Sequence, residues 1–185
     1  MPGRTGWCVW ITGLPGSGKS TVAKALLKTL KKGGIKAQIL SSDLVRKAIT
    51  PEPTYSLEER DMAYSLIVCM AKALVENNIN IILDATGNLR RYRERARRKI
   101  TRFMEVYVRC PRKVAIQRET KRRHFTHAPD GIYKKALEKE SRTVPGLGVP
   151  YEEPLKPEVT VDSDRLKPNQ CAQEIFEAIV KNFLS

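Results

Sequence analysis

The chain has 185 residues, of which 41% are hydrophobic and 29% charged, and its net charge is +14. This composition is typical of a globular protein and excludes a disordered or collagen-like chain. The length suits one domain, and no apolar run is long enough to span a bilayer. The excess of positive charge favours anionic partners: nucleotides, phosphate or sulfate esters, or nucleic acid.

The cysteines and the first residues of the chain indicate its cellular compartment. No apolar segment typical of a secretory signal follows Met1. The cysteines form no C-x-x-C pair, and we expect them to be small core residues in a reducing compartment. The sequence therefore predicts a cytoplasmic protein. The four cysteines are Cys8, Cys69, Cys110 and Cys171.

The first predicted unit is a strand, a glycine-rich loop and a helix. The apolar run Cys8–Ile11 predicts a buried strand. Residues Gly13–Ser20 then match the phosphate-loop pattern G-x-x-x-x-G-K-[ST]. Apolar residues at helical spacing follow, at Val22, Ala25, Leu26 and Leu30. This order favours a phosphate loop over an ordinary tight turn, because a helix N-terminus attracts anions.

A phosphate loop binds a nucleotide through backbone N–H groups, which approach the phosphates only where no Cβ intervenes. Lys19 would contact the β- and γ-phosphates, and the Ser20 hydroxyl would complete the shell of a Mg²⁺ ion. We therefore expect ATP and Mg²⁺ as cofactors. The predicted ATP-binding residues are Gly13, Pro15, Gly16, Ser17, Gly18, Lys19, Ser20 and Thr21.

Two further apolar runs each lead to a carboxylate. Ala37–Leu40 precedes Asp43, and Ile79–Leu83 ends at Asp84. Because ligands bind at the carboxyl ends of parallel strands, both acids should converge on the phosphate loop. Asp43 is the candidate catalytic group that orients or deprotonates an acceptor hydroxyl, and Arg46 would hold an anionic part of the acceptor. Asp84 is the candidate for a Mg²⁺-bound water. Each aspartate could instead cap the segment after it.

A long helix is expected between these two strands. Ser56 and Glu59 have the spacing of a capping box, which predicts a helix to about Glu76. The expected inner face of this helix consists of Met62, Leu66, Met70 and Leu74.

An arginine-rich helix is expected after Asp84, with Asn88 as its cap. Its apolar stripe would be Leu89, Tyr92, Ala96 and Ile100. Most other positions are basic, and either a solvated face or a nucleic-acid contact would explain them. The basic set comprises Arg90, Arg91, Arg93, Arg95, Arg97, Arg98, Lys99 and Arg102.

The rest of the chain continues the alternation of strands and helices. Phe103–Val108 predicts a fourth strand, with Pro111 at the start of a helix, and Val159–Val161 predicts a fifth strand. A lid is expected at about residues 121–157. The alternation predicts a single three-layer α/β domain over residues 1–185, of the P-loop NTPase fold. Its mostly parallel five-stranded sheet would carry helices on both faces.

Several motifs resemble those of the adenylylsulfate kinase family. Asp43–Arg46 matches the second half of its D-G-D-N-V-R, and Tyr55–Arg60 is similar to F-S-x-x-D-R. Gly131–Ala136 is similar to the lid motif G-L-Y-K-K-A, and Pro150–Pro154 matches P-Y-E-x-P. The resemblance implies transfer of the γ-phosphate of ATP to the 3′-hydroxyl of adenosine 5′-phosphosulfate (adenylylsulfate). It also implies substrate contacts from Tyr55, Arg60, Tyr133 and Lys134, and a homodimer.

The chain departs from this family around the acceptor. Ser41-Ser42 replaces the D-G before Asp43, Ala63 replaces an asparagine, and Asp84–Leu89 replaces A-x-I-S-P-Y. Asp84–Asn88, followed by arginines, resembles polynucleotide 5′-kinases and kinases of aminoacyl-tRNA. A nucleic-acid acceptor is therefore the alternative, and a nucleotide-gated binding module without turnover is a third hypothesis.

Overall fold

The computed structural model describes residues 5–50, 52–121, 133 and 143–184. Within these residues five parallel strands form one sheet in the order β2-β3-β1-β4-β5. This arrangement confirms the predicted fold class. The strands are β1 (Cys8–Thr12), β2 (Gln38–Ser41), β3 (Ile81–Asp84), β4 (Phe103–Arg109) and β5 (Val159–Asp162).

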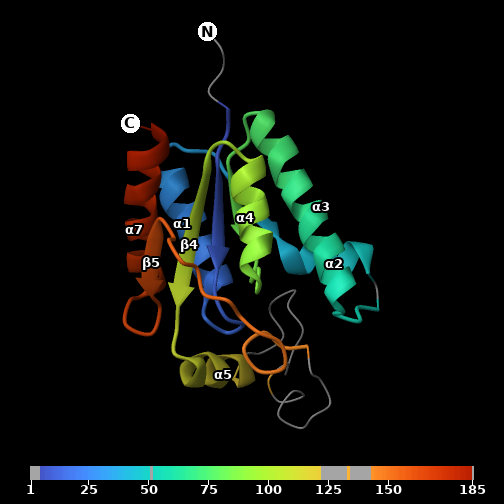
Figure 1. Cartoon of the computed structure of the whole chain (residues 1–185). Coiled ribbons are helices and arrows are strands. Elements are labelled where there is room, and N and C mark those ends of the chain that lie inside the picture. Colours follow the sequence, from blue (N-terminus) through green and yellow to red (C-terminus); the bar gives the residue numbers. More distant parts are fainter. Residues whose placement is uncertain (1–4, 51, 122–132, 134–142, 185) are drawn as a thin grey trace.

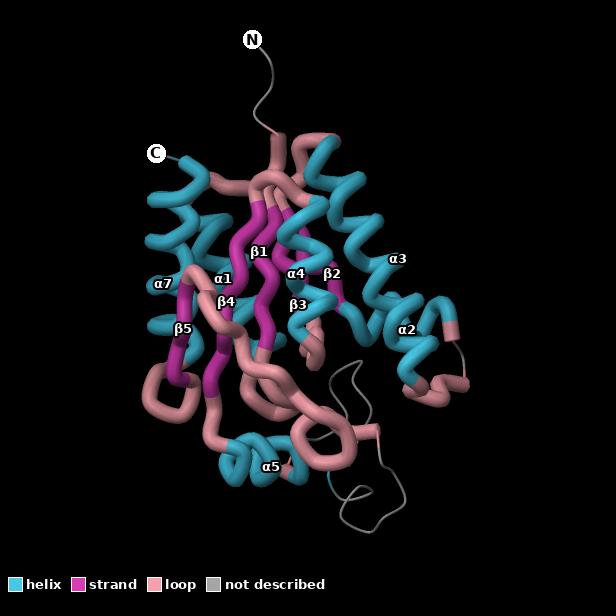
Figure 2. The backbone as a smooth tube through the Cα atoms, viewed as in Figure 1, coloured by secondary structure: helices cyan, strands magenta, loops and turns pink. Residues whose placement is uncertain are grey.

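Helices cover both faces of the sheet (Figure 1). Figure 2 shows α1 and α7 on one side of the strands and α3 and α4 on the other. The helices are α1 (Lys19–Lys32), α2 (Ser42–Ile49), α3 (Leu57–Glu76), α4 (Arg90–Lys99), α5 (Arg112–Thr120), α7 (Pro168–Ile179) and the π-helix η1 (Val180–Leu184).

The hydrophobic core has two halves, because successive strand residues point to opposite faces. In β1, Val9 and Ile11 pack with α1 and α7, whereas Cys8 and Trp10 pack with α3 and α4. The central strand is therefore buried throughout, which explains its unbroken apolar sequence.

Helix α3 turns a different face inward from the one predicted. Met62, Leu66 and Met70 are 60%, 37% and 38% exposed, while Leu74 is only partly buried. The buried face instead includes Tyr64, whose ring stacks on Tyr92 of α4 at 4.4 Å and on Trp10 of β1 at 6.1 Å. The prediction for the inner face was therefore wrong, because ring stacking and small residues decide which side of α3 approaches the sheet. The residues buried in this helix are Glu59, Arg60, Ala63, Tyr64, Ile67, Val68, Ala71 and Val75.

Three smaller predictions also fail. Cys69 is exposed, whereas the other three cysteines are buried. Asn88 does not cap α4, since its side-chain amide donates to Pro150 O at 3.0 Å and Leu89 occupies the cap position. Pro111 lies immediately before α5 rather than in its first turn.

Among the described helices, none is long and apolar enough to cross a bilayer.

Candidate nucleotide and acceptor site

The phosphate loop connects β1 to α1 at the end of the sheet to which the strand arrows point (Figure 1). Gly13 has φ +154°, and a Cβ there would lie 2.6 Å from Ser17 Oγ and 2.5 Å from Val108 O. A Cβ at Gly16, with φ +77°, would collide with Ala115 O of α5. Both positions therefore require glycine, as the motif predicts.

Polar groups inside the loop lie where an anion would bind. Lys19 Nζ donates to Leu14 O at 3.0 Å, so its ammonium lies across the loop. Ser17 Oγ is buried without a hydrogen-bond partner in the described part of the chain. A buried hydroxyl of this kind is costly unless a ligand satisfies it. The cradle therefore has the shape and donors that a phosphate group needs.

The two predicted acids lie beside this loop. In the strand ladders Asp84 is the partner of both Ile11 and Ser41, so the tips of β1, β2 and β3 are level. Asp84 is 8% exposed, and its carboxyl group is hydrogen-bonded to Ser20. Burial raises the pKa of Asp84; Lys19 and the Ser20 bond oppose the rise, and the Asp43 charge adds to it. The structure thus brings Asp84 and the loop together, and it places Asp43 in the first turn of α2, two residues beyond the tip of β2.

These residues suit a magnesium ion better than a metal held by protein alone. Among the described residues, no group of three or more His, Cys, Asp or Glu side chains could hold a metal ion. Mg²⁺ accepts hard oxygen ligands, keeps several waters and commonly binds through one or two protein oxygens plus substrate phosphates. The Ser20 hydroxyl and the Asp84 carboxylate fit that donor set.

A second cluster forms where α2 meets α3. Arg46 Nη1 bonds Glu59 Oε1 at 3.0 Å, and both side chains are buried. Glu59 Oε2 accepts from the backbone N–H groups of Thr54 at 2.6 Å and Tyr55 at 2.8 Å. Burial works to raise the pKa of Glu59, but these hydrogen bonds outweigh it and the pKa falls. Glu59 was predicted only as part of a cap, and Ser56 does accept its N–H at 3.1 Å.

Two guanidinium groups lie close to the ring of Tyr55: the Cζ atoms of Arg46 and Arg60 are 5.3 Å and 5.7 Å from the ring centroid. The φ of Tyr55, +56°, is unusual for a bulky residue. Arg60 holds this backbone, since its Nε donates to Tyr55 O at 3.1 Å, and its Nη2 reaches Thr143 O at 2.5 Å. The structure therefore assembles Arg46, Tyr55 and Arg60 in one cluster, as the resemblance implies.

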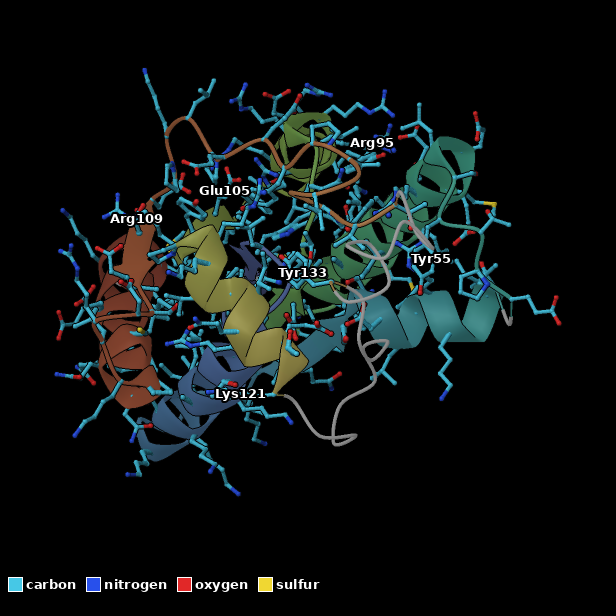
Figure 3. The ribbon with its side chains drawn as sticks, turned by 90° about the horizontal axis from the view of Figure 1, so that it is seen from below. Tyr55, Arg95, Glu105, Arg109, Lys121 and Tyr133 are labelled. Carbon is cyan, nitrogen blue, oxygen red and sulfur yellow. The ribbon has the colours of Figure 1, made fainter. Side chains whose placement is uncertain are left out.

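The residues predicted for the lid fall partly outside the described residues. Tyr133 is buried, and its hydroxyl donates to Pro15 O of the phosphate loop at 3.0 Å. Figure 3 shows Tyr133 near the middle of this end of the molecule. Lys134 lies outside the described residues, as do Gly131 and most of the predicted helix 132–141.

Arg93 organises a feature that the sequence reading missed. We call Pro150–Pro154 the strap. Arg93, 1% exposed, donates to Glu105 Oε1 at 2.6 Å, to Glu152 O of the strap at 2.6 Å, and to Gly87 O. One buried guanidinium thus joins β4, the segment after β3 and the strap. The only signal in the sequence was an arginine next to Tyr92 on the apolar stripe.

Most other arginines of the basic set also make contacts within the molecule. Arg91 pairs with Asp61 at 3.0 Å, Arg97 with Glu158 at 2.5 Å, and Arg102 donates to Thr5 O at 2.5 Å. Arg90 Nε bonds Glu153 O of the strap at 2.8 Å. These contacts favour a structural role for the arginines over a surface that binds nucleic acid.

A cavity of about 980 Å³ opens beside the phosphate loop. It lies between Leu14, the end of β4 from Arg109 to Pro111, and the turn after β5. The loop 146–151 forms its remaining wall. Cavities of this size accept small-molecule ligands.

Comparison with known proteins agrees with this geometry. The family model for adenylylsulphate kinase matches residues 5–162. The chain is 40% identical to a probable adenylyl-sulfate kinase of Pyrococcus abyssi over 171 residues, which cover 92% of this chain and 93% of the relative. It is 34% identical to an adenylyl-sulfate kinase of Thermodesulfovibrio yellowstonii, covering 97% of this chain and 86% of the relative.

Solved structures agree in fold. The Mycobacterium tuberculosis APS kinase in complex with AMPPNP and APS superposes with a TM-score of 0.84 at 28% identity, covering 96% of this chain and 99% of that one. A shikimate kinase from Acinetobacter baumannii, 18% identical with a TM-score of 0.60, shares the fold alone. By its motifs, its family match and its fold, this chain belongs to the adenylylsulfate kinase family.

Proposed function

We propose that this chain transfers the γ-phosphate of ATP to the 3′-hydroxyl of adenosine 5′-phosphosulfate. Membership of the family is the observation that carries this proposal, because the match from residue 5 to residue 162 includes the acceptor motifs as well as the phosphate loop. The AMPPNP and APS bound to the Mycobacterium tuberculosis relative support both substrates.

Each site residue then has a chemical task. Lys19 stabilises charge on the migrating phosphoryl group, and Asp43 orients or deprotonates the acceptor hydroxyl. Arg46 and Arg60 keep Tyr55 in place, so that its ring can stack on the acceptor base and their remaining N–H donors can contact its anionic oxygens. Tyr133 and Lys134 complete the acceptor side.

The donor nucleotide occupies the phosphate loop, and its nucleoside enters the cavity beside Leu14. Ser20 and Asp84 would hold Mg²⁺, which when bound neutralises charge on the β- and γ-phosphate oxygens. The single-domain organisation with a lid at about 121–157, the cytoplasmic location and the homodimer stay part of this proposal.

Release of ADP with different acceptors tests the function. ATP plus adenosine 5′-phosphosulfate should give rapid ADP release, whereas ATP alone or with a 5′-hydroxyl oligonucleotide should give only a background rate. Stimulation by the oligonucleotide would support the nucleic-acid kinase instead. Equal, slow release in all three reactions would support a binding module and contradict the proposal.

A further inference from the structure

One carboxylate of the family pattern is missing from this chain, and another has been added. The first aspartate of D-G-D-N-V-R falls at Ser41, which carries no charge. The alanine of A-x-I-S-P-Y falls at Asp84. In the sequence these two positions are far apart.

In the sheet the two positions are neighbours. Ser41 and Asp84 are register partners at the tips of β2 and β3, and adjacent strands lie about 4.8 Å apart. Both side chains point to the same face of the sheet, because Ile39 and Ile82, two residues earlier in each strand, pack in the cluster beneath α1 and α7. That face carries the phosphate loop, and Asp84 is hydrogen-bonded to Ser20 there.

We propose that Asp84 supplies, from β3, the carboxylate that the family supplies from the position of Ser41 on β2, and that it orients the Mg²⁺ of bound ATP together with Ser20. This inference rests on the proposed function only in taking ATP with Mg²⁺ as the phosphoryl donor. The identity of the acceptor does not enter.

The exchange is chemically feasible because Mg²⁺ keeps several of its waters in such sites. A carboxylate that orients the ion through a bound water does not need one fixed backbone position. From the neighbouring strand it can accept a hydrogen bond from another water of the same shell. Outer-shell partners of this kind typically contribute about 10- to 100-fold to metal affinity.

Variants that remove the carboxylate at position 84 and introduce one at position 41 test the proposal. We would measure the affinity for AMPPNP by isothermal titration calorimetry, in Mg²⁺ and in EDTA, and compare the Mg²⁺ enhancement between variants. Asp84→Asn should reduce the enhancement by about tenfold or more. Adding Ser41→Asp to Asp84→Asn should restore most of it, whereas the matched control Ser41→Asn should not.

Two results would overturn the proposal: an unchanged Mg²⁺ enhancement in Asp84→Asn, or a Ser41→Asp double variant no better than its Ser41→Asn counterpart. Asp84→Ser, which keeps a hydrogen-bond partner for Ser20, is measured in parallel in case Asp84→Asn does not fold. Since the experiment contains no acceptor, it can succeed even if adenosine 5′-phosphosulfate is not the substrate. Likewise, adenosine 5′-phosphosulfate can be the substrate even if the Mg²⁺ enhancement does not depend on Asp84.

Discussion

At the scale of single residues, Asp43 is the proposed acid that orients or deprotonates the acceptor hydroxyl. It lies in the first turn of α2, two residues after the end of β2, and its charge adds to the rise in the pKa of Asp84 beside the phosphate loop. Asp43→Asn keeps the shape of the side chain but removes its ability to accept a proton. We expect kcat to fall by about 10²-fold or more while AMPPNP affinity stays unchanged. A variant with full kcat would remove Asp43 from the mechanism.

Glu59 should make stability sensitive to acid. Its pKa is lowered in the folded protein, so its contribution is complete above its unfolded pKa of about 4.5 and is lost as the pH falls through the lower, folded value. Glu59→Gln breaks the buried pair with Arg46 and should cost about 3 kcal/mol near pH 7.

Urea denaturation of both proteins at about pH 7 and about pH 3 measures this effect. The difference in free energy of unfolding should be smaller at the acid pH, because the wild-type carboxylate becomes protonated there. An equal difference at both pH values would show that the pair does not depend on the Glu59 charge.

At the scale of elements, the segment after β3 is a tightly packed turn near the site. Gly87 has φ +50°, and a Cβ there would lie 2.7 Å from Trp10 Cζ2 and 3.1 Å from Arg93 Cγ. Gly34, at the end of α1, has φ +73° but no atom within 4 Å of such a Cβ. Gly87→Ala should therefore destabilise the protein by about 2 kcal/mol more than Gly34→Ala. Thermal unfolding of the two variants compares them, and equal melting temperatures would contradict the packing argument.

The faces of the helices show what sequence could and could not predict. The phosphate loop, the order of strands and helices, and the two acids followed from local patterns, because strand ends in a parallel sheet meet at one edge. Helix α3 carries apolar residues on two faces, and only its stacking on Trp10 and Tyr92 decides between them. The buried partners of Arg93 come from segments far apart in the chain, so no local pattern could identify them.

At the scale of the whole molecule, Arg93 joins parts that are distant in sequence. A lysine at this position would keep the charge but could not reproduce the planar fork that reaches Glu105, Gly87 and the strap. We expect Arg93→Lys to cost about 2 kcal/mol and to lower the melting temperature by about 4–8 °C. Arg98→Lys, at an exposed position of the same helix, is the control and should leave it unchanged. Similar melting temperatures for the two variants would show that the junction contributes little.

The net charge of +14 does not measure how much basic surface is open to a partner. Ion pairs and backbone contacts engage many arginines of α4, so the total charge overstates the basic surface open to a large polyanion. Composition alone suggested nucleic acid as a partner, but the contacts of the described arginines favour this partner less.

The pairing of β2 with β3 also matters when related sequences are compared for the functional acids that they keep. A comparison that inspects one alignment column at a time would see at Ser41 only the loss of an acid. Two columns far apart in the alignment describe one spot in space. Scoring register partners jointly would recover any member whose carboxylate lies on the adjacent strand, as we propose for Asp84.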